Sequence, residues 1–317
     1  MARDIKVDGE TVSPGAKALH TVQLPVDGTT LEIPIFLING SGEGPTLVVT
    51  GGIHGAEYAS IEAALELGRT LDPGPLSGRV IIVPVVSVAS FKARSIYVNP
   101  LDRKNLNRVF PGRADGTASE QLAYWLVNTV MKLGDYYIDL HGGDLVEALT
   151  PFSGYYVTGN TGLDARSAKL AEVFGIRYII PDQLKGSTLF AAAQLGLPAM
   201  LAEAGGMGVW RRDQVEEHTR GLDRVLRHLG MLQGPPLEPL ETQVLGQDIW
   251  LRSERDGFFY TRRNVGDMVQ AGEDLGAVTD TAGQVLQQVL APMSGVILFQ
   301  VSSLAMNQGD PLVAVGG

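Results

Sequence analysis

The sequence predicts an α/β domain with a mostly parallel or mixed central sheet flanked by helices, followed by a small all-β module. Apolar, β-branched runs alternate with segments of helical period through most of the first 230 residues, which is typical of βαβ units. The proline-rich stretch GPPLEPLE at 234–241 favours an extended connector. Beyond it, short alternating segments interrupted by Gly and Asp favour an all-β fold.

Each element of this prediction follows from a local pattern. Apolar runs indicate strands at 31–38, 46–50, 79–86, 136–140, 154–158, 178–180 and 198–203. Helical periodicity indicates helices at 57–70, 118–133, 164–174, 187–195 and 212–230. We expect His218 and His228, in the polar last helix, to face solvent. The connector divides the chain into a catalytic domain, 1–236, and a C-terminal β-module, 237–317.

Composition excludes several classes of protein. The 317 residues contain no cysteine, which rules out a disulfide scaffold and a cysteine nucleophile and leaves His, Asp and Glu to hold any metal. A net charge of −10 gives no electrostatic support for nucleic-acid or anionic-membrane partners. The N-terminus lacks an apolar signal-peptide core. We therefore expect a soluble, cytoplasmic protein with neither a nucleic acid nor a membrane as partner.

Two histidines stand where α/β proteins bind ligands. His54 follows the strand at 46–50, and Glu57 lies three residues on at the start of a helix; His141 follows the strand at 136–140. The carboxyl ends of parallel strands open on one edge of the sheet. Two His and one Glu make the ligand set of a catalytic zinc that keeps a position for water. Each residue taken singly has an ordinary interpretation, a structural histidine or a carboxylate favoured by the helix dipole.

Two further features lie beside the expected zinc site. Glu203 ends the strand at 198–203, where a carboxylate can take a proton from water and return it to a leaving amine; the alternative is a solvated loop carboxylate. The segment from Lys92 to Arg113 has six basic residues and one acidic residue. Its Asn107 and Arg108 predict a clamp for a substrate carboxylate, although a solvated basic loop would have the same composition.

These motifs together resemble a known family. The motifs are GGIHGAEY with His54 and Glu57, NLNRVFPG with Asn107 and Arg108, DLHGG with His141, and finally Glu203. They occur in the order found in succinylglutamate desuccinylases and aspartoacylases. That family is a branch of the zinc carboxypeptidase fold. DRKNLNRVFPG and IDLHGG look similar to members that deacetylate N-acetyl-diaminobutyrate. The resemblance covers about residues 25–230.

The resemblance implies the cofactor and the role of each site residue. It implies one zinc ion per chain held by His54, Glu57 and His141, with Glu203 as general base and acid. Asn107 and Arg108 would bind the substrate's carboxylate. Family members also use an upstream arginine to polarise the scissile carbonyl. Here Arg94 is the favoured residue, and Arg103 is the alternative or a further substrate-binding residue.

The C-terminal module has a resemblance of its own. NVGDMVQAGEDLGAVTD and APMSGVI are similar to biotinyl and lipoyl carrier domains, which are barrel-sandwich folds. A carrier needs a modified lysine, however, and the last lysine of this chain is Lys185. The module is therefore expected to cap the active-site edge or to form a subunit interface in a homo-oligomer.

The expected activity is zinc-dependent hydrolysis of the amide bond of a small N-acyl amino acid. A zinc carboxypeptidase acting on short peptides would use the same metal and the same carboxylate clamp, so the motifs leave it open. A non-catalytic zinc- or ligand-binding protein of this fold is a third possibility. The sequence leaves open the acyl group and the amino acid.

Overall fold

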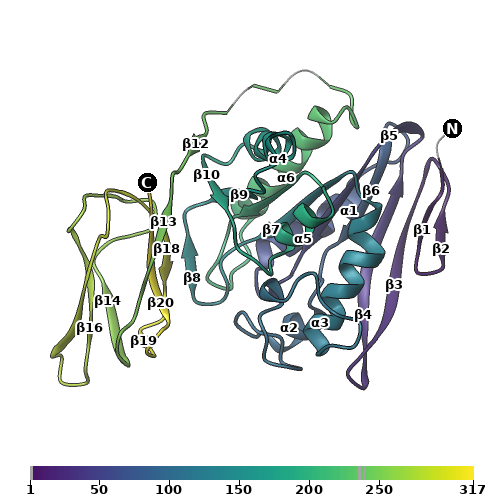
Figure 1. Ribbon diagram of the computed structural model, residues 1–317. Coiled ribbons are helices and arrows are strands. Elements are labelled where there is room, and N and C mark those ends of the chain that lie inside the picture. The colour runs from purple at the N-terminus through teal and green to yellow at the C-terminus, as the bar shows by residue number, and fades with distance from the viewer. Residues whose placement is uncertain (1–2, 235–236, 239) are drawn as a thin grey trace.

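A large mixed sheet lies between two layers of helices, and two smaller antiparallel sheets follow at the C-terminus (Figure 1). These features come from a computed structural model that describes residues 3–234, 237–238 and 240–317. The predicted α/β class with a large mixed sheet and helices is confirmed.

The large sheet has nine strands. Across the sheet they are β12 (Gln243–Val244), β10 (Tyr178–Asp182), β9 (Phe152–Tyr156), β11 (Ala199–Glu203), β7 (Tyr136–His141), β5 (Gly42–Gly51), β6 (Ser77–Val83), β4 (Thr29–Asn39) and β3 (Ala16–Val26). The four central strands, β11, β7, β5 and β6, run parallel. β4 and β3 continue one side antiparallel, and β9 pairs antiparallel with β11 on the other.

Helices cover both faces of this sheet. One layer contains α1 (Tyr58–Thr70), α4 (Thr161–Phe174) and α6 (Arg212–His228), which share one apolar core. The other layer includes α3 (Ala118–Trp125) and α5 (Thr188–Gln194), which share a second core. Alternate residues of a strand point to opposite faces. In β5, accordingly, Leu47 and Val49 belong to the first core and Val48 to the second.

The sequence predicted the central elements and missed peripheral ones. All seven expected strands and five expected helical segments are present, but 118–133 is α3 followed by a π-helical turn, Leu126–Val130, and a 3-10 turn, Met131–Leu133. The unpredicted elements are β1 (Ile5–Val7), β2 (Glu10–Val12), β3, α2 (Val88–Ala93), the 3-10 turn Leu106–Arg108 and β8 (Glu147–Leu149). β3 was missed because it is an edge strand with polar residues on its exposed side.

The expectation that His218 faces solvent is wrong. His218 is fully buried, on a stripe of α6 that includes Val215, Leu222 and Val225. These positions are spaced three and four residues apart and therefore lie on one helix face. His228, at the end of the same helix, is exposed as predicted.

The C-terminal region is all-β, as predicted. One sheet contains β13 (Asp248–Arg252), β20 (Pro311–Gly316), β18 (Gly295–Val301), β15 (Met268–Val269) and, beside β18, β8. The other contains β17 (Val285–Leu290), β16 (Asp274–Thr279), β14 (Gly257–Thr261) and β19 (Ala305–Met306). They share a core that includes Phe259, Leu275 and Phe299. β8 comes from the α/β part, which therefore contributes one strand to this C-terminal sheet.

The connector lies partly outside the described residues, because positions 235, 236 and 239 are not among them. The boundary between 236 and 237 therefore stays a prediction. Beyond it, β12 still pairs with β10 of the large sheet. No helix in the described ranges is long and apolar enough to cross a lipid bilayer.

Candidate metal centre

Strand β7 places two functional side chains on one face of the sheet. Ile138 and Leu140 point into the core shared with α1, α4 and α6, so Asp139 and His141 point the opposite way. Their side chains meet, with Asp139 Oδ2 2.9 Å from His141 Nε2. β11 runs parallel to β7 and aligns Glu203 with His141. Glu203 therefore lies on the same face as the histidine.

The loop after β5 supplies the other two predicted ligands. His54 lies in this loop, and Glu57 is the N-cap residue of α1. Gly55 makes the loop's path possible, because a Cβ there would lie 2.1 Å from the amide nitrogen of Phe91 in α2. The turn brings His54 Nδ1 to 2.7 Å from Glu57 Oε1.

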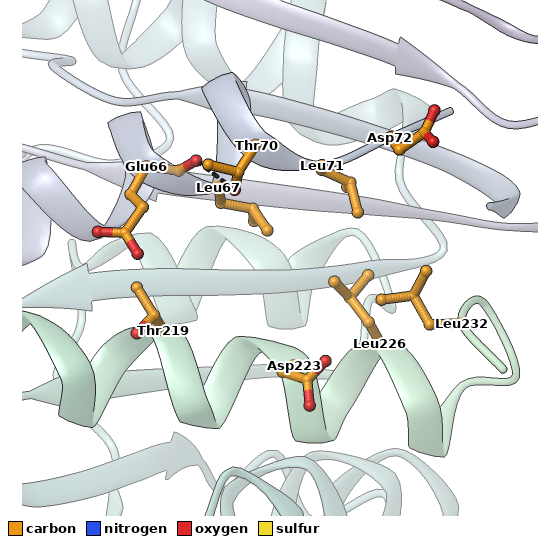
Figure 2. A pocket seen from close by; sticks show the side chains of 9 residues that line it. All are labelled: Glu66, Leu67, Thr70, Leu71, Asp72, Thr219, Asp223, Leu226 and Leu232. Atoms are coloured by element: carbon orange, nitrogen blue, oxygen red, sulfur yellow. Dashed lines mark hydrogen bonds between the residues drawn. The ribbon is translucent and has the colours of Figure 1, made fainter. Parts of the chain in front are cut away.

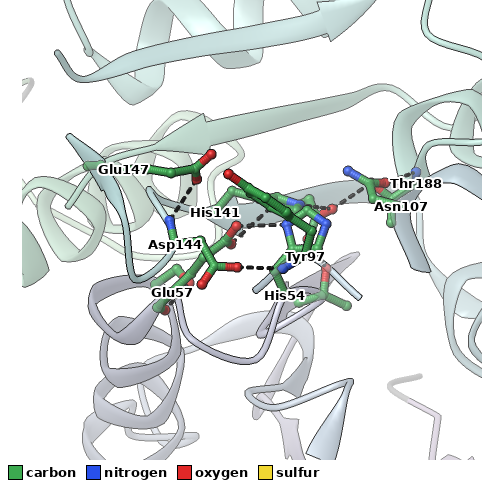
Figure 3. A network of polar contacts seen from close by, with 12 residues as sticks. His54, Glu57, Tyr97, Asn107, His141, Asp144, Glu147 and Thr188 are labelled. Atoms are coloured by element: carbon green, nitrogen blue, oxygen red, sulfur yellow. Dashed lines mark hydrogen bonds and ion pairs between the residues drawn. The ribbon is translucent and has the colours of Figure 1, made fainter. Parts of the chain in front are cut away.

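The two segments meet at Glu57. His141 Nδ1 lies 3.0 Å from Glu57 Oε2, so each carboxylate oxygen faces the Nδ1 atom of one histidine (Figure 3). One potential ligand atom from each of the three residues lies within 4.8 Å of the other two. The structure thus brings together the three predicted ligands from two distant parts of the chain.

The cluster fits a divalent metal ion. Glu57 Oε2 is buried and has no hydrogen-bond partner among the described residues, although His141 Nδ1 is only 3.0 Å away. Two atoms that are close without hydrogen-bond geometry are expected where both face a common cation. Two imidazole nitrogens and a carboxylate are the protein ligands of many catalytic zinc sites.

The outward nitrogens of both histidines are fixed by neighbours. His54 Nε2 lies 3.0 Å from Asn105 Oδ1, and His141 Nε2 lies 2.9 Å from Asp139 Oδ2. With a metal ion bound, donation to these oxygens would leave both Nδ1 atoms as lone-pair donors on the side of Glu57. Metal-binding histidines are usually oriented in this way.

Without a metal ion the cluster holds protons. Burial lowers the pKa of His141, but Asp139 and Glu57 outweigh this and raise the net value well above normal. Burial also opposes the charged form of Glu57, yet the two histidines bring its pKa down to about 2. A metal would have to displace the imidazole protons, so metal binding should release protons.

Glu203 has the environment of a general base and acid. In the described part of the chain its carboxylate makes no hydrogen bond or ion pair. Burial raises its pKa well above the usual range, and the nearby carboxylates Glu57 and Glu147 add to this, while His141 opposes it. A cation at the cluster would favour the charged form.

The basic segment contributes Asn107 and Arg108 in different ways. Asn107 is buried, and its Oδ1 accepts a hydrogen bond of 2.9 Å from the backbone N–H of Thr188. This orients the amide so that Nδ2 remains available to a ligand. Arg108 donates through Nη1 to the carbonyl of Asn107. Burial lowers its pKa, whereas the fields of Asp182 and Glu203 oppose that change.

The two arginines considered for carbonyl polarisation are both exposed. Arg94 caps the end of α2 with φ +52°, and Arg103 has φ +58°. Neither side chain makes a hydrogen bond or ion pair with any described residue. The structure therefore gives no reason to prefer one over the other, and both assignments stay predictions.

Tyr97, Asp144 and Glu147 are among the residues near the cluster that the sequence analysis did not predict. Tyr97, with φ +56°, donates its backbone N–H to Asp144 Oδ2 at 2.9 Å, and Asp144 donates its own N–H to Glu147 Oε2 at 2.7 Å. Burial raises the pKa of Glu147 to about 7, despite hydrogen bonds from Asp144 and Tyr97 that oppose the rise. Figure 3 draws these side chains beside the predicted metal ligands His54, Glu57 and His141. No residue spacing marked them beforehand.

A separate hollow lies away from this chemistry. It has a volume of about 250 Å³ between α1 and α6 (Figure 2). Its lining includes Glu66, Leu71, Thr219 and Asp223 and none of the predicted site residues. This hollow therefore contributes nothing to the metal centre.

Comparisons with known proteins agree with this geometry. Residues 43–229 match the family model described as the succinylglutamate desuccinylase/aspartoacylase catalytic domain. The chain is 30% identical over 292 residues to the N-alpha-acetyl-L-2,4-diaminobutyric acid deacetylase of Halomonas elongata, covering 89% of this chain and 85% of that protein.

Solved structures extend the likeness to nearly the whole fold. A succinylglutamate desuccinylase/aspartoacylase from Rhodobacter sphaeroides superposes with a TM-score of 0.86 at 26% identity, covering 95% of both chains. The product-bound ectoine utilization protein of Ruegeria pomeroyi also has a TM-score of 0.86, at 28% identity, covering 95% of this chain and 94% of that one.

Proposed function

Because the chain belongs to the succinylglutamate desuccinylase/aspartoacylase family, we propose that it hydrolyses the amide bond of a small N-acyl amino acid at a metal ion held by His54, Glu57 and His141. The observation that carries the proposal is the meeting of these three residues within 4.8 Å beside Glu203. We propose zinc as the metal, one ion per chain, because the ligands are two imidazoles and a carboxylate.

The residues around the metal have distinct tasks in this mechanism. A zinc ion bound there would lower the pKa of a water molecule and polarise the acyl carbonyl. Glu203, whose carboxylate makes no other described contact, accepts the water's proton and passes it to the departing amine. His54 and His141 keep their Nδ1 atoms directed at the ion because Asn105 and Asp139 hold the opposite nitrogens.

The basic segment binds the other end of the substrate. Arg108 meets the substrate's carboxylate with its guanidinium fork, and Asn107 donates through Nδ2, the amide atom left available by its bond to Thr188. Arg94 is proposed to polarise the acyl oxygen, with Arg103 as the alternative. Holding the substrate at both ends would present its amide bond to the His54, Glu57 and His141 cluster beside Glu203.

We propose an N-acetylated diamino acid as the first substrate to test. The relative from Halomonas elongata, at 30% identity, is described as acting on N-alpha-acetyl-L-2,4-diaminobutyric acid. The partly buried carboxylate of Glu147 is close enough to Glu203 to raise the pKa of that residue, and a second ammonium group of the substrate would be attracted there.

The decisive assay offers purified protein three substrates: N-acetyl-L-2,4-diaminobutyrate, N-succinyl-L-glutamate and a dipeptide. We expect hydrolysis of an N-acyl amino acid, about one zinc per chain and loss of both on chelation. A preference for the dipeptide would indicate a carboxypeptidase. A metal-free protein without activity would indicate a binding protein.

A pair of variants tests the role of Glu203. Glu203→Gln should keep the zinc and lose about 100 to 10,000-fold in turnover. Glu217→Gln, on the surface of α6, is the matched control and should keep full turnover. Turnover retained by Glu203→Gln would disprove the assigned role.

Three wider expectations accompany this proposal. We propose that the C-terminal sheets form a barrel-sandwich module, because they are two small antiparallel sheets around one core. We propose a cytoplasmic location and self-association through this module. Analytical ultracentrifugation checks the last point.

A further inference from the structure

Thr188 links a metal ligand to the proposed substrate clamp. Its Oγ1 donates to Asp139 Oδ2 at 2.5 Å, and the same oxygen lies 2.9 Å from His141 Nε2. Its backbone N–H donates to Asn107 Oδ1 at 2.9 Å. One residue therefore contacts both the carboxylate that orients His141 and the amide proposed to bind substrate. Asp139, Thr188 and His141 are buried.

A second path joins Asn107 to the other histidine. Asn105 Oδ1 accepts the backbone N–H of Asn107 at 2.8 Å and lies 3.0 Å from His54 Nε2. Since both histidines also contact Glu57, these contacts close a ring. Its members, in order, are Glu57, His54, Asn105, Asn107, Thr188, Asp139 and His141.

Within this ring, the Thr188 hydroxyl is the group that helps to fix the orientation of the Asp139 carboxylate. Thr50 Oγ1 holds the other carboxylate oxygen at 2.7 Å, so the buried carboxylate has a defined set of donors. Removing the Thr188 hydroxyl leaves a lone pair of Asp139 unpaired in a site closed to water, which is costly. Asp139 would then be held only by Thr50 at Oδ1 and by His141 itself at Oδ2, so the orientation of His141 would be less firmly fixed.

We propose that Thr188 is a positioning residue that couples metal binding to the substrate clamp, so that displacing Asn107 weakens zinc binding and loosening Asp139 weakens the clamp. The clamp half of this inference rests on the proposed function. The coupling is reciprocal, because a change at either site alters the same hydrogen-bonded ring.

The first test measures zinc affinity of metal-free full-length protein by competition with a chromogenic chelator. Thr188→Val keeps the shape and the backbone N–H and removes only the hydroxyl; we expect about tenfold weaker zinc binding. Thr188→Ser restores the hydroxyl and should bind zinc within about twofold of the parent protein. Unchanged affinity in Thr188→Val would overturn the proposal.

Ser187 provides the matched control. Its Oγ caps α5 by accepting the N–H of Phe190 and donates to the carbonyl of Leu184. Among the described residues, this hydroxyl makes no hydrogen bond to a member of the ring, although Ser187 precedes Thr188 in the chain. Ser187→Ala removes this cap and should lower Tm, but it should leave zinc affinity unchanged. An equal loss of affinity in Ser187→Ala and Thr188→Val would mean that α5 acts only through general stability, and the proposal would fail.

A double-mutant cycle tests the coupling itself. Asn107→Ala removes the acceptor facing Thr188 and should weaken zinc binding several-fold, although Asn107 is not a ligand. In the Thr188→Val background the same change should have a smaller effect. Additive effects would refute the coupling. If Thr188→Val fails to fold, Thr188→Ala replaces it in the cycle.

A kinetic arm separates this inference from the proposed function. At saturating zinc, Thr188→Val should raise KM for the hydrolysed N-acyl amino acid more than it lowers kcat, and an unchanged KM would contradict the coupling. If the parent protein hydrolyses no member of the panel, the proposed function fails, but the zinc affinities still decide whether Thr188 positions the metal ligand.

Discussion

His218 should make the protein sensitive to mild acid. It is fully buried on α6, with Nε2 3.2 Å from the carbonyl of Ala204, and Nδ1 has no hydrogen-bond partner in the part of the chain that the structure describes. Burial lowers its pKa from the ordinary 6.5 to about 4, and the bond to Ala204 opposes only part of this change. The folded protein therefore keeps His218 neutral where the unfolded chain takes up a proton.

The sign and size of the effect follow from this difference. Above pH 6.5 neither state is protonated at His218, so its neutral form carries no penalty. Between pH 6.5 and 4 the unfolded state binds more protons, and the free energy of unfolding falls as the pH falls. At about 1.4 kcal/mol per pH unit, the loss is about 3 kcal/mol.

Urea unfolding of the metal-free protein at pH 7 and pH 4 measures this loss. His218→Gln places an uncharged amide donor near the position of Nε2, so its stability relative to the parent protein should improve by about 3 kcal/mol between the two pH values. His228→Gln, at the exposed end of the same helix, is the control and should show a far smaller change. A difference between His218→Gln and the parent that does not vary with pH would refute the reasoning.

Three other predictions follow from the structure. Burial raises the pKa of Glu147 to about 7, so folding becomes less favourable as the pH rises from 4.5 to 7. In urea unfolding at pH 8, Glu147→Gln should therefore be more stable than the metal-free parent protein by up to about 3 kcal/mol. Below pH 4.5 this difference should be absent. A Cβ at position 221 would lie 2.2 Å from the buried ring of Phe174, so Gly221→Ala should lose about 1–3 kcal/mol and show a lower Tm; an unchanged Tm would show that the ring can move aside. Arg94→Ala should lower kcat about 100 to 1,000-fold and Arg103→Ala should not; the reverse result would transfer carbonyl polarisation to Arg103.

The sequence predicted that His54, Glu57 and His141 would lie together because their positions follow from topology. His141 ends β7 and His54 lies in the loop after β5, and the carboxyl ends of parallel strands meet at one edge of a sheet. The same rule placed Glu203 beside His141. The contact between Asp139 and His141 also follows from the sequence, because residues two apart in a strand share a face.

Other parts of the site depend on contacts that no local pattern encodes. The link between Thr188 and Asn107 joins residues 81 positions apart through a backbone N–H, which any residue type could supply. Tyr97 owes its place to a left-handed backbone conformation in a loop. His218 was misassigned because α6 is polar on average, while its apolar stripe is narrow and includes the histidine itself.

The strand that the α/β part contributes to the C-terminal sheet has a consequence for protein engineering. β8 begins six residues after His141 and pairs along β18, and the carbonyl of Glu147 at its start accepts the N–H of Met207, in the loop after Glu203. A shortened chain that stops before the module would leave β8 without its partner strand β18. The loops that follow His141 and Glu203 would then lose this support. Chimeras that exchange the module between relatives should therefore exchange residues 147–149 with it, since the two pieces form one sheet.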